Sequence, residues 1–453
     1  MTTSQGFSRR AALAGGAAIA AGSLVHPALA RGVAQRHFPK GFLWGTAISA
    51  HQSEGNDVNS DSWLLENLPG TVYKDPSGDA CDSYHRYEQD LDIAHAMGLN
   101  CYRFGIEWAR IEPEQGRFSQ AELDHYAKML EACRKRGLLP IVTYNHFTVP
   151  LWFAKRGGWE VADSADLFAR FCERTTLSLG PLIGMASTFN EANIPQLGKI
   201  LRMGQPPEYF ARRRAMIATA AKATDSPAFS SLLFADPDKV APHLLDAHAK
   251  GYQAIKAGPG DFPVGVTLST QQFEAVGENS LAPMIEKMSY GGWWDAVNAS
   301  DFVGVQTYTR IRLDAKGVVP NPGAEMTASG YEYYPPALGY TIRLARKMTD
   351  KPIYVTETGT STDNDARRVA WLDATIAEVA KCIAEGIDVK SYIYWSLLDN
   401  FEWTSGYAQH FGMVSVDLSN FTRTLKPSAR HFAQLVKAGC SDCLFRHAGT
   451  SPG

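Results

Sequence analysis

The sequence predicts an α/β protein folded as a (β/α)₈ TIM barrel, in a single catalytic domain that spans residues 31–453. Three observations lead to this fold class. Eight short apolar segments recur along the chain, amphipathic helical stretches separate most of them, and polar or aromatic residues gather where the apolar segments end. An open, doubly wound sheet is the alternative, but no glycine-rich phosphate loop follows the first apolar segment.

Residues 1–30 are expected to form an export signal rather than part of the fold. Arg9 and Arg10 precede an Ala- and Gly-rich apolar run that ends in Ala-Leu-Ala at residues 28–30, a small-x-small cleavage pattern. The paired arginines are typical of a twin-arginine signal and predict a periplasmic or secreted protein without a membrane anchor after cleavage. A retained anchor is the alternative, although the run is short and glycine-rich for a membrane span.

Eight segments are predicted to form the strands of the barrel. They are short, apolar and largely non-alternating, as expected for strands that are buried on both faces. They cover residues 42–49, 101–108, 138–147, 185–191, 263–270, 301–308, 352–358 and 391–398.

Amphipathic helices are predicted between these strands. Residues 83–98 space their apolar side chains at helical intervals and stop at a glycine. Residues 119–137 open with Ser119, followed three residues later by Glu122, which predicts a capping box. Residues 367–386 have the same amphipathic character and lie between the last two strands.

Charge and cysteine content limit the possible functions. The formal net charge is −3 and no basic run is present, which argues against nucleic acid as a partner. Cys440 and Cys443 form a CSDC pair that could bridge in an oxidising compartment. No HExxH or paired CxxC motif is present, so neither a metal nor another cofactor is expected. The other cysteines are expected to be small buried apolar residues: Cys81, Cys101, Cys133, Cys172 and Cys382.

The ends of the predicted strands carry the functional signal. In a (β/α)₈ barrel the carboxyl ends of the strands meet at one mouth, where catalytic residues lie. The pair Asn190–Glu191 could instead be a helix cap followed by an acidic first turn. The accumulation of charged, amide and aromatic groups at one mouth favours a catalytic site. These groups are Arg103, Glu107, Trp108, His146, Asn190, Glu191, Tyr308, Glu357 and Trp395.

Two glutamates are placed for acid–base chemistry. Glu191 ends the fourth strand and Glu357 the seventh, nearly across the barrel from each other. Glycoside hydrolysis needs such a pair, one protonated to assist the leaving oxygen and one ionised to attack the anomeric carbon, about 5–5.5 Å apart in retaining enzymes. Arg103 and Tyr308 could keep Glu357 ionised, which favours Glu357 as nucleophile and Glu191 as acid. For Arg103, an ordinary structural ion pair is the alternative.

Several stretches match one known family in order and spacing. They are FPKGFLWGTAISAHQSEG, YRFGIEWARIEPEQG, LLPIVTYNHFTVPLWF, TFNEAN, YVTETGT and YWSLLDNFEWTSGYAQHFGMVSVD. On these stretches the chain resembles glycoside hydrolase family 1, the β-glucosidase-like retaining enzymes, over nearly all of the mature length. The resemblance implies that Glu191 is the acid/base and Glu357 the nucleophile. It also implies a cis peptide bond between Trp395 and Ser396.

The same resemblance implies a set of sugar-binding residues. Asn190 would hydrogen-bond the sugar 2-hydroxyl, Gln52 and Glu402 suit neighbouring hydroxyls, and Trp395 offers an apolar floor for the ring. Taken singly, such residues could instead satisfy loop backbone or pack in the core. Their position within matching motifs favours binding. The implied substrate-binding set is Gln52, His146, Asn190, Tyr308, Trp395, Glu402, Trp403 and Phe411, with Arg103 in support.

The chain departs from the family pattern at three places. Ala192 follows the Asn-Glu pair instead of proline, Thr358 replaces an asparagine, and Gln306 begins Gln-Thr-Tyr instead of Asn-Tyr-Tyr. Both glutamates are retained, so hydrolysis is still expected and a thioglucosidase without the acid is not. Altered hydrogen bonding at positions 306 and 358 is expected to affect rate and specificity. The carboxylate of Glu402 would repel a sugar 6-phosphate.

The sequence therefore predicts a retaining β-glycosidase, with β-glucosidase as the favoured activity on β-linked glucosides or oligosaccharides. A transglycosylase on the same site and a catalytically silent sugar-binding receptor are the alternatives. Residues 194–238 match the family poorly, so the preferred leaving group stays open.

Overall fold

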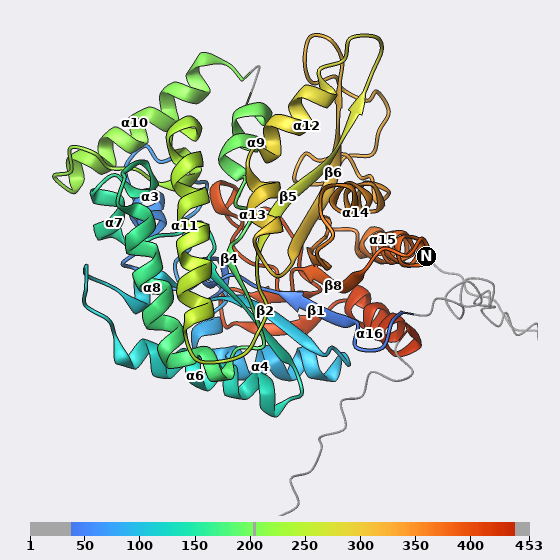
Figure 1. The fold of residues 1–453 in the computed structure, drawn as a ribbon, viewed down its shortest axis with the longest axis horizontal. Helices are drawn as coiled ribbons and strands as arrows, with labels where there is room; N and C mark the ends of the chain where they lie inside the picture. The colour runs from blue at the N-terminus through green and yellow to red at the C-terminus, as the bar shows by residue number, and fades with distance from the viewer. Residues whose placement is uncertain (1–37, 203–204, 440–453) are drawn as a thin grey trace, which may run out of the picture.

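The computed structural model describes residues 38–202 and 205–439 of the chain (Figure 1). Eight parallel strands close into a barrel in sequence order, with β8 paired to β1, so the predicted (β/α)₈ fold is confirmed. The predicted export signal and the pair Cys440–Cys443 lie outside the described residues. The barrel strands are β1 Leu43–Ala47, β2 Cys101–Gly105, β3 Leu139–Asn145, β4 Met185–Phe189, β5 Val264–Ala275, β6 Val303–Leu313, β7 Ile353–Glu357 and β8 Val389–Trp395.

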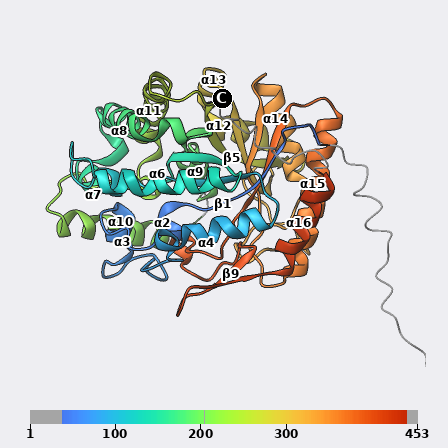
Figure 2. The same ribbon diagram turned by 90° about the horizontal axis from the view of Figure 1, so that it is seen from below.

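Helices surround the strands in both ribbon views (Figures 1 and 2). A short antiparallel pair, β9 Val414–Asp417 and β10 Thr422–Leu425, follows the barrel. Single 3₁₀ turns lie at η1 Gly158–Glu160, η2 Gly180–Leu182, η3 Leu232–Phe234 and η4 Trp403–Ser405. The helices are α2 Ala50–Ser53, α3 Asp61–Glu66, α4 Ser83–Ala96, α5 Trp108–Ile111, α6 Gln120–Lys135, α7 Leu151–Lys155, α8 Ser164–Leu179, α9 Ile194–Leu201, α10 Pro207–Ala223, α11 Pro237–Ala257, α12 Ala282–Tyr290, α13 Trp293–Asn298, α14 Ala337–Met348, α15 Asp365–Ala384 and α16 Pro427–Gly439.

The predicted helices are confirmed as α4, α6 and α15, and the capping box is half confirmed. The Ser119 hydroxyl accepts from the backbone N–H of Glu122 at 3.3 Å, as predicted for the start of α6. The Glu122 carboxylate does not complete the box in the expected way. It accepts instead from the Tyr84 hydroxyl at 3.0 Å and so links α6 to α4.

Strands β5 and β6 run further than the sequence predicts. Their parallel pairing continues beyond the barrel, from Gln272 opposite Arg310 to Ala275 opposite Leu313. Arg310 forms an ion pair with Glu274 at 2.6 Å, which links the two strands in this extension. The extension carries the loop 314–336, which returns to the mouth of the barrel.

The interior of the barrel forms a separate small core beneath the mouth. Leu43, Ile141, Phe302 and Ile393 pack there under Trp395. The five cysteines predicted to be small buried residues are confirmed as buried and free: Cys81, Cys101, Cys133, Cys172 and Cys382. In the described part of the chain, none of the helices has the length and apolarity that crossing a membrane requires.

Candidate active site

Glu191 and Glu357 lie at the mouth of the barrel on different strands. Glu191 is the second residue after the end of β4 and has a φ of +44°, an uncommon conformation for a residue other than glycine. Its N–H donates to the Thr267 hydroxyl of β5 at 3.1 Å, which fixes this turn. Glu357 is the last residue of β7, and its side chain is buried. Arg103 donates both to Glu357 and to Asn190, the residue before Glu191, so the two glutamates lie at the same part of the mouth. Their separation of about 5–5.5 Å stays a prediction.

Arg103 connects the nucleophile candidate to Asn190. From β2, its Nη1 donates to Glu357 Oε1 at 2.5 Å, and its Nη2 donates to Asn190 Oδ1 at 2.6 Å. The Tyr308 hydroxyl donates to the other oxygen, Glu357 Oε2, at 2.6 Å. Both oxygens of Glu357 are therefore held by donors, and the expected contacts of Arg103 and Tyr308 with this carboxylate are confirmed. Arg103 is also 1% exposed, so the pair has the burial of a structural ion pair as well.

Asn190 belongs to this network and is not a helix cap. Helix α9 begins at Ile194 with Asn193 in the cap position, so the alternative of an Asn190 cap is wrong. Asn190 Oδ1 also accepts from Gln306 Nε2 at 2.8 Å. Because Oδ1 accepts from both Arg103 and Gln306, the amide is oriented with Nδ2 as its donor end. The glutamine that departs from the family pattern at position 306 thus still supports Asn190.

The two carboxyl groups differ in their electrostatic surroundings. Burial and, to a smaller extent, the charge of Glu357 raise the pKa of Glu191 to about 8. Burial also raises the pKa of Glu357, but the ion pair with Arg103 and the hydrogen bond from Tyr308 both lower it. Glu357 is therefore the group that ionises first, and Glu191 is the group that retains its proton near neutral pH.

The predicted hydroxyl-binding side chains Gln52 and Glu402 also come together. Trp395 ends β8, its Nε1 donates to Glu402 Oε1 at 3.2 Å, and the peptide bond from Trp395 to Ser396 is cis. Gln52 Nε2 donates to the Phe401 carbonyl at 2.8 Å. The alternative role of Gln52, a hydrogen bond to loop backbone, is therefore observed. Burial raises the pKa of Glu402 to about 8, while hydrogen bonds from Trp395 and Gln52 lower it. Gln52 thus lies against Glu402 as well as against the backbone.

His146 lies between two tryptophan rings at the same mouth. Its ring is stacked at a centroid distance of 5.7 Å from Trp395 and 6.2 Å from Trp403. Burial, together with the charge of Arg103, holds the pKa of His146 well below its usual value, so the imidazole is neutral. No group in the described part of the chain hydrogen-bonds its buried Nδ1. Phe411 packs edge-on against Tyr308, with ring centroids 5.9 Å apart. The predicted catalytic and substrate-binding residues, together with Arg103, are thus connected at this mouth, and their roles stay predictions.

Two residues at predicted strand ends do not belong to the site. Trp108 packs in an aromatic core outside the mouth, stacked on Phe171 at 5.1 Å. Glu107 accepts from the Thr148 hydroxyl at 2.7 Å and from the N–H of Ala109, which caps α5. The chain leaves β2 at Gly105, before these residues, so they turn away from the barrel axis.

Tyr331 is a site residue that sequence reasoning missed. It lies in the loop 314–336, with its ring 6.5 Å from that of Tyr308. Tyr308 donates to Glu357, so its neighbour Tyr331 lies beside the group that holds the nucleophile candidate. Its side chain remains 40% exposed, as a residue at an entrance would be. The aromatic run Tyr331–Tyr334 was the available signal, but it follows no predicted strand directly.

Within residues 38–202 and 205–439, no group of three His, Cys, Asp or Glu side chains is arranged to hold a metal ion. The site combines two carboxyl groups in different electrostatic surroundings with aromatic rings at the mouth of a (β/α)₈ barrel. This arrangement is typical of enzymes that cleave glycosidic bonds. The protein is a glycoside hydrolase. The model of Glycosyl hydrolase family 1 matches residues 34–284 and 295–440, and the chain belongs to this family.

Relatives and solved structures agree with this assignment. The chain is 30% identical to a β-glucosidase of Agrobacterium sp. over 88% of this chain and 95% of that protein. The solved structure of a β-glycosidase, BGL167, is 43% identical, covers 92% of this chain and 100% of its own, and has a TM-score of 0.84. A β-glucosidase from Thermotoga maritima in complex with glucoimidazole is 26% identical, covers 89% of this chain and 99% of its own, and has a TM-score of 0.79.

Proposed function

We propose that the protein is a retaining β-glucosidase that releases non-reducing terminal β-D-glucosyl residues by double displacement. The proposal depends on one observation: the two glutamates differ in the hydrogen-bond donors and charges that surround their carboxyl groups. Glu357 has a donor on each oxygen, from Arg103 and from Tyr308, whereas burial raises the pKa of Glu191 and no cation from the described residues is bonded to its carboxyl group. Relatives that are named β-glucosidases support the same activity.

In the first step Glu357 attacks the anomeric carbon, and Glu191 transfers its proton to the departing glycosidic oxygen. One oxygen of Glu357 forms the bond while the other stays held by its donor, so the carboxylate keeps its orientation. In the second step Glu191, now ionised, takes a proton from a water molecule that attacks the glycosyl-enzyme ester. Attack from opposite faces in the two steps retains the β configuration.

The remaining residues of the mouth would bind the terminal sugar. Asn190 presents the Nδ2 end of its amide to the 2-hydroxyl, and Gln52 and Glu402 form the polar side of the sugar site. Trp395 supplies an apolar face. The β-glucosidase from Thermotoga maritima has been solved in complex with glucoimidazole, which supports a glucosyl residue as the sugar bound here. The Glu402 carboxyl group disfavours sugar 6-phosphates.

Proton NMR during hydrolysis of an aryl β-glucoside tests this proposal. We expect β-glucose to appear first and to equilibrate with the α anomer afterwards. Initial release of α-glucose would contradict a retaining mechanism. Glucosyl transfer that exceeds hydrolysis at high acceptor concentration would identify a transglycosylase. Binding of glucosides without turnover would identify a receptor. A panel of β-linked disaccharides and aryl glycosides in the same assay defines the sugar and the leaving group.

We also propose that residues 1–30 direct export through a twin-arginine route to the periplasm or the medium. The support is the sequence pattern around Arg9 and Arg10 and the small residues at positions 28–30. Expression of the full chain in a bacterium should place a product that begins at Arg31 outside the cytoplasm. Replacement of both arginines by lysine should retain the uncleaved chain in the cytoplasm. Unchanged export of that variant would contradict the proposal.

A further inference from the structure

His51 is a buried charged residue beside the site that the mechanism above does not use. It lies in α2, next to Gln52, and is 1% exposed. Its Nδ1 lies 3.0 Å from Asp57 Oδ2, and its Nε2 lies 3.4 Å from Glu66 Oε2. Burial lowers the pKa of His51, but hydrogen bonds to Asp57 and Glu66 raise it more, to about 10. The ring is therefore an imidazolium at neutral pH.

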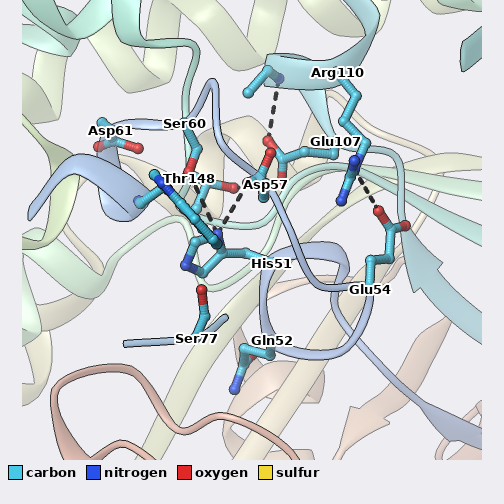
Figure 3. Close-up of polar contacts among 12 residues, drawn as sticks. His51, Gln52, Glu54, Asp57, Ser60, Asp61, Ser77, Glu107, Arg110 and Thr148 are labelled. Carbon is cyan, nitrogen blue, oxygen red and sulfur yellow. Dashed lines mark hydrogen bonds and ion pairs between the residues drawn. The ribbon is translucent and has the colours of Figure 1, made fainter. Parts of the chain in front are cut away.

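One of the two carboxylates that hold His51 has a further donor, since the Ser77 hydroxyl donates to Glu66 Oε1. The Ser60 hydroxyl lies 3.5 Å from the Nδ1 of His51 (Figure 3). Asp57 and Glu66 are 2% and 3% exposed, so water does not compete for these contacts. A buried ring with a carboxylate at each nitrogen has a single orientation.

The faces and edge of this ring contact the segment that carries Glu402. His51 is stacked on Trp403 with centroids 5.7 Å apart and ring planes 9° apart. It meets Phe401 edge-on at 6.0 Å. Trp403 and Phe401 are the two chain neighbours of Glu402. A cation within about 6 Å of an indole centroid is attracted to the ring, so the charge of His51 strengthens the stack.

Trp403 thus contacts two histidines of different charge. The neutral ring of His146 stacks on it at a centroid distance of 6.2 Å, and the charged ring of His51 stacks on it at 5.7 Å. The neighbouring Gln52 adds a hydrogen bond to the Phe401 carbonyl. Two consecutive residues of α2 thus contact the segment 401–403, which belongs to the loop after β8.

We propose that His51 is a positioning residue for recognition of the terminal sugar. Held by Asp57 and Glu66, it fixes Trp403 and Phe401 and thereby places the Glu402 carboxyl group against the sugar hydroxyls. This inference rests on the proposed function, because it assumes that Trp403 and Glu402 bind the terminal sugar. Since His51 touches neither Glu191 nor Glu357, its loss should weaken sugar binding and discrimination between C4 epimers more than the chemical step.

Steady-state kinetics of His51→Phe and Asp57→Asn on aryl β-glucoside and β-galactoside test the proposal. We expect KM for the glucoside to rise about tenfold, a change typical of one lost cation–π or charged contact, with kcat within about twofold. The preference for glucoside over galactoside should fall. Asp90→Asn is the matched control, because Asp90 is a buried aspartate paired with Arg423 at 2.9 Å, away from the mouth. It should lower Tm without changing KM or the preference.

A double-mutant cycle with Trp403→Phe separates positioning from general stability. If His51 acts through Trp403, the KM changes of the two substitutions should be strongly non-additive. Additive KM changes, or a fall in Tm with unchanged KM and epimer preference, would contradict the proposal. So would a failure of both His51→Phe and Asp57→Asn to fold while Asp90→Asn folds, since the network would then only stabilise. A wild type that does not hydrolyse β-glucosides would refute the proposed function itself, which is a distinguishable outcome.

Discussion

Replacement of Glu357 by glutamine is expected to lower kcat for an aryl β-glucoside on the order of 10⁴- to 10⁶-fold, the loss seen when a nucleophile is removed. The neutral amide cannot form the glycosyl-enzyme ester. It also offers only one acceptor oxygen to the two donors, from Arg103 and Tyr308, that hold the native carboxylate. Pre-steady-state and steady-state release of the phenol measure this loss.

Glu112→Gln is a suitable control for this experiment. Glu112 is a fully buried glutamate that accepts from the Trp108 indole at 2.9 Å outside the mouth. Its substitution should affect Tm and leave kcat within a few-fold of the wild type. In Glu357→Gly, added azide should occupy the vacated space and yield the α-glucosyl azide, because it attacks from the face that Glu357 used. Residual activity of Glu357→Gln within tenfold of the wild type would refute the nucleophile assignment.

Glu191→Ala is expected to have the second largest effect, and its size should depend on the leaving group. For alkyl glucosides, whose alcohols depart poorly without a proton, kcat/KM should fall about 10²- to 10⁴-fold. For a glucoside of an acidic phenol, which departs as the anion, the first step should change little and the glycosyl-enzyme should accumulate. Azide should then attack that ester and yield the β-glucosyl azide. Equal losses on both substrates would contradict the role of Glu191 as acid.

The pH dependence provides a second measure of the same residue. Burial and Glu357 raise the pKa of Glu191 to about 8. The protonated form of Glu191 is the active one in the first step, so wild-type kcat/KM should fall as the pH rises through about 8. This alkaline limb should be absent from Glu191→Ala with a phenyl leaving group. If the alkaline decrease in kcat/KM persists unchanged in Glu191→Ala, it reports the titration of another residue.

The residues at the strand ends could be predicted from the sequence. Parallel strands in a closed barrel bring their carboxyl ends together wherever they lie in the chain, so Glu191 and Glu357 could be placed at one mouth from the order of the apolar segments. The start of α6 at Ser119 followed equally from a local pattern, since a cap contacts its own first turn.

Other features depend on partners that no local pattern specifies. Tyr331 reaches the mouth because β5 and β6 pair beyond the barrel and return their loop, and ion pairs such as Arg310 with Glu274 stabilise that extension. Gln306 keeps the orientation of Asn190 although it departs from the family pattern. Trp108 has the sequence position of a site residue but packs in the outer core.

The sequence alone determined the barrel, the two catalytic candidates and the family, because period, caps and motifs are properties of neighbouring residues. Only the tertiary structure decided which glutamate has a cation bonded to it, which loop residue joins the mouth, and that His51 stacks on Trp403. These depend on contacts between residues far apart in the chain. The energies of such contacts are set by burial and by the angle and distance between side chains, which a linear pattern does not contain.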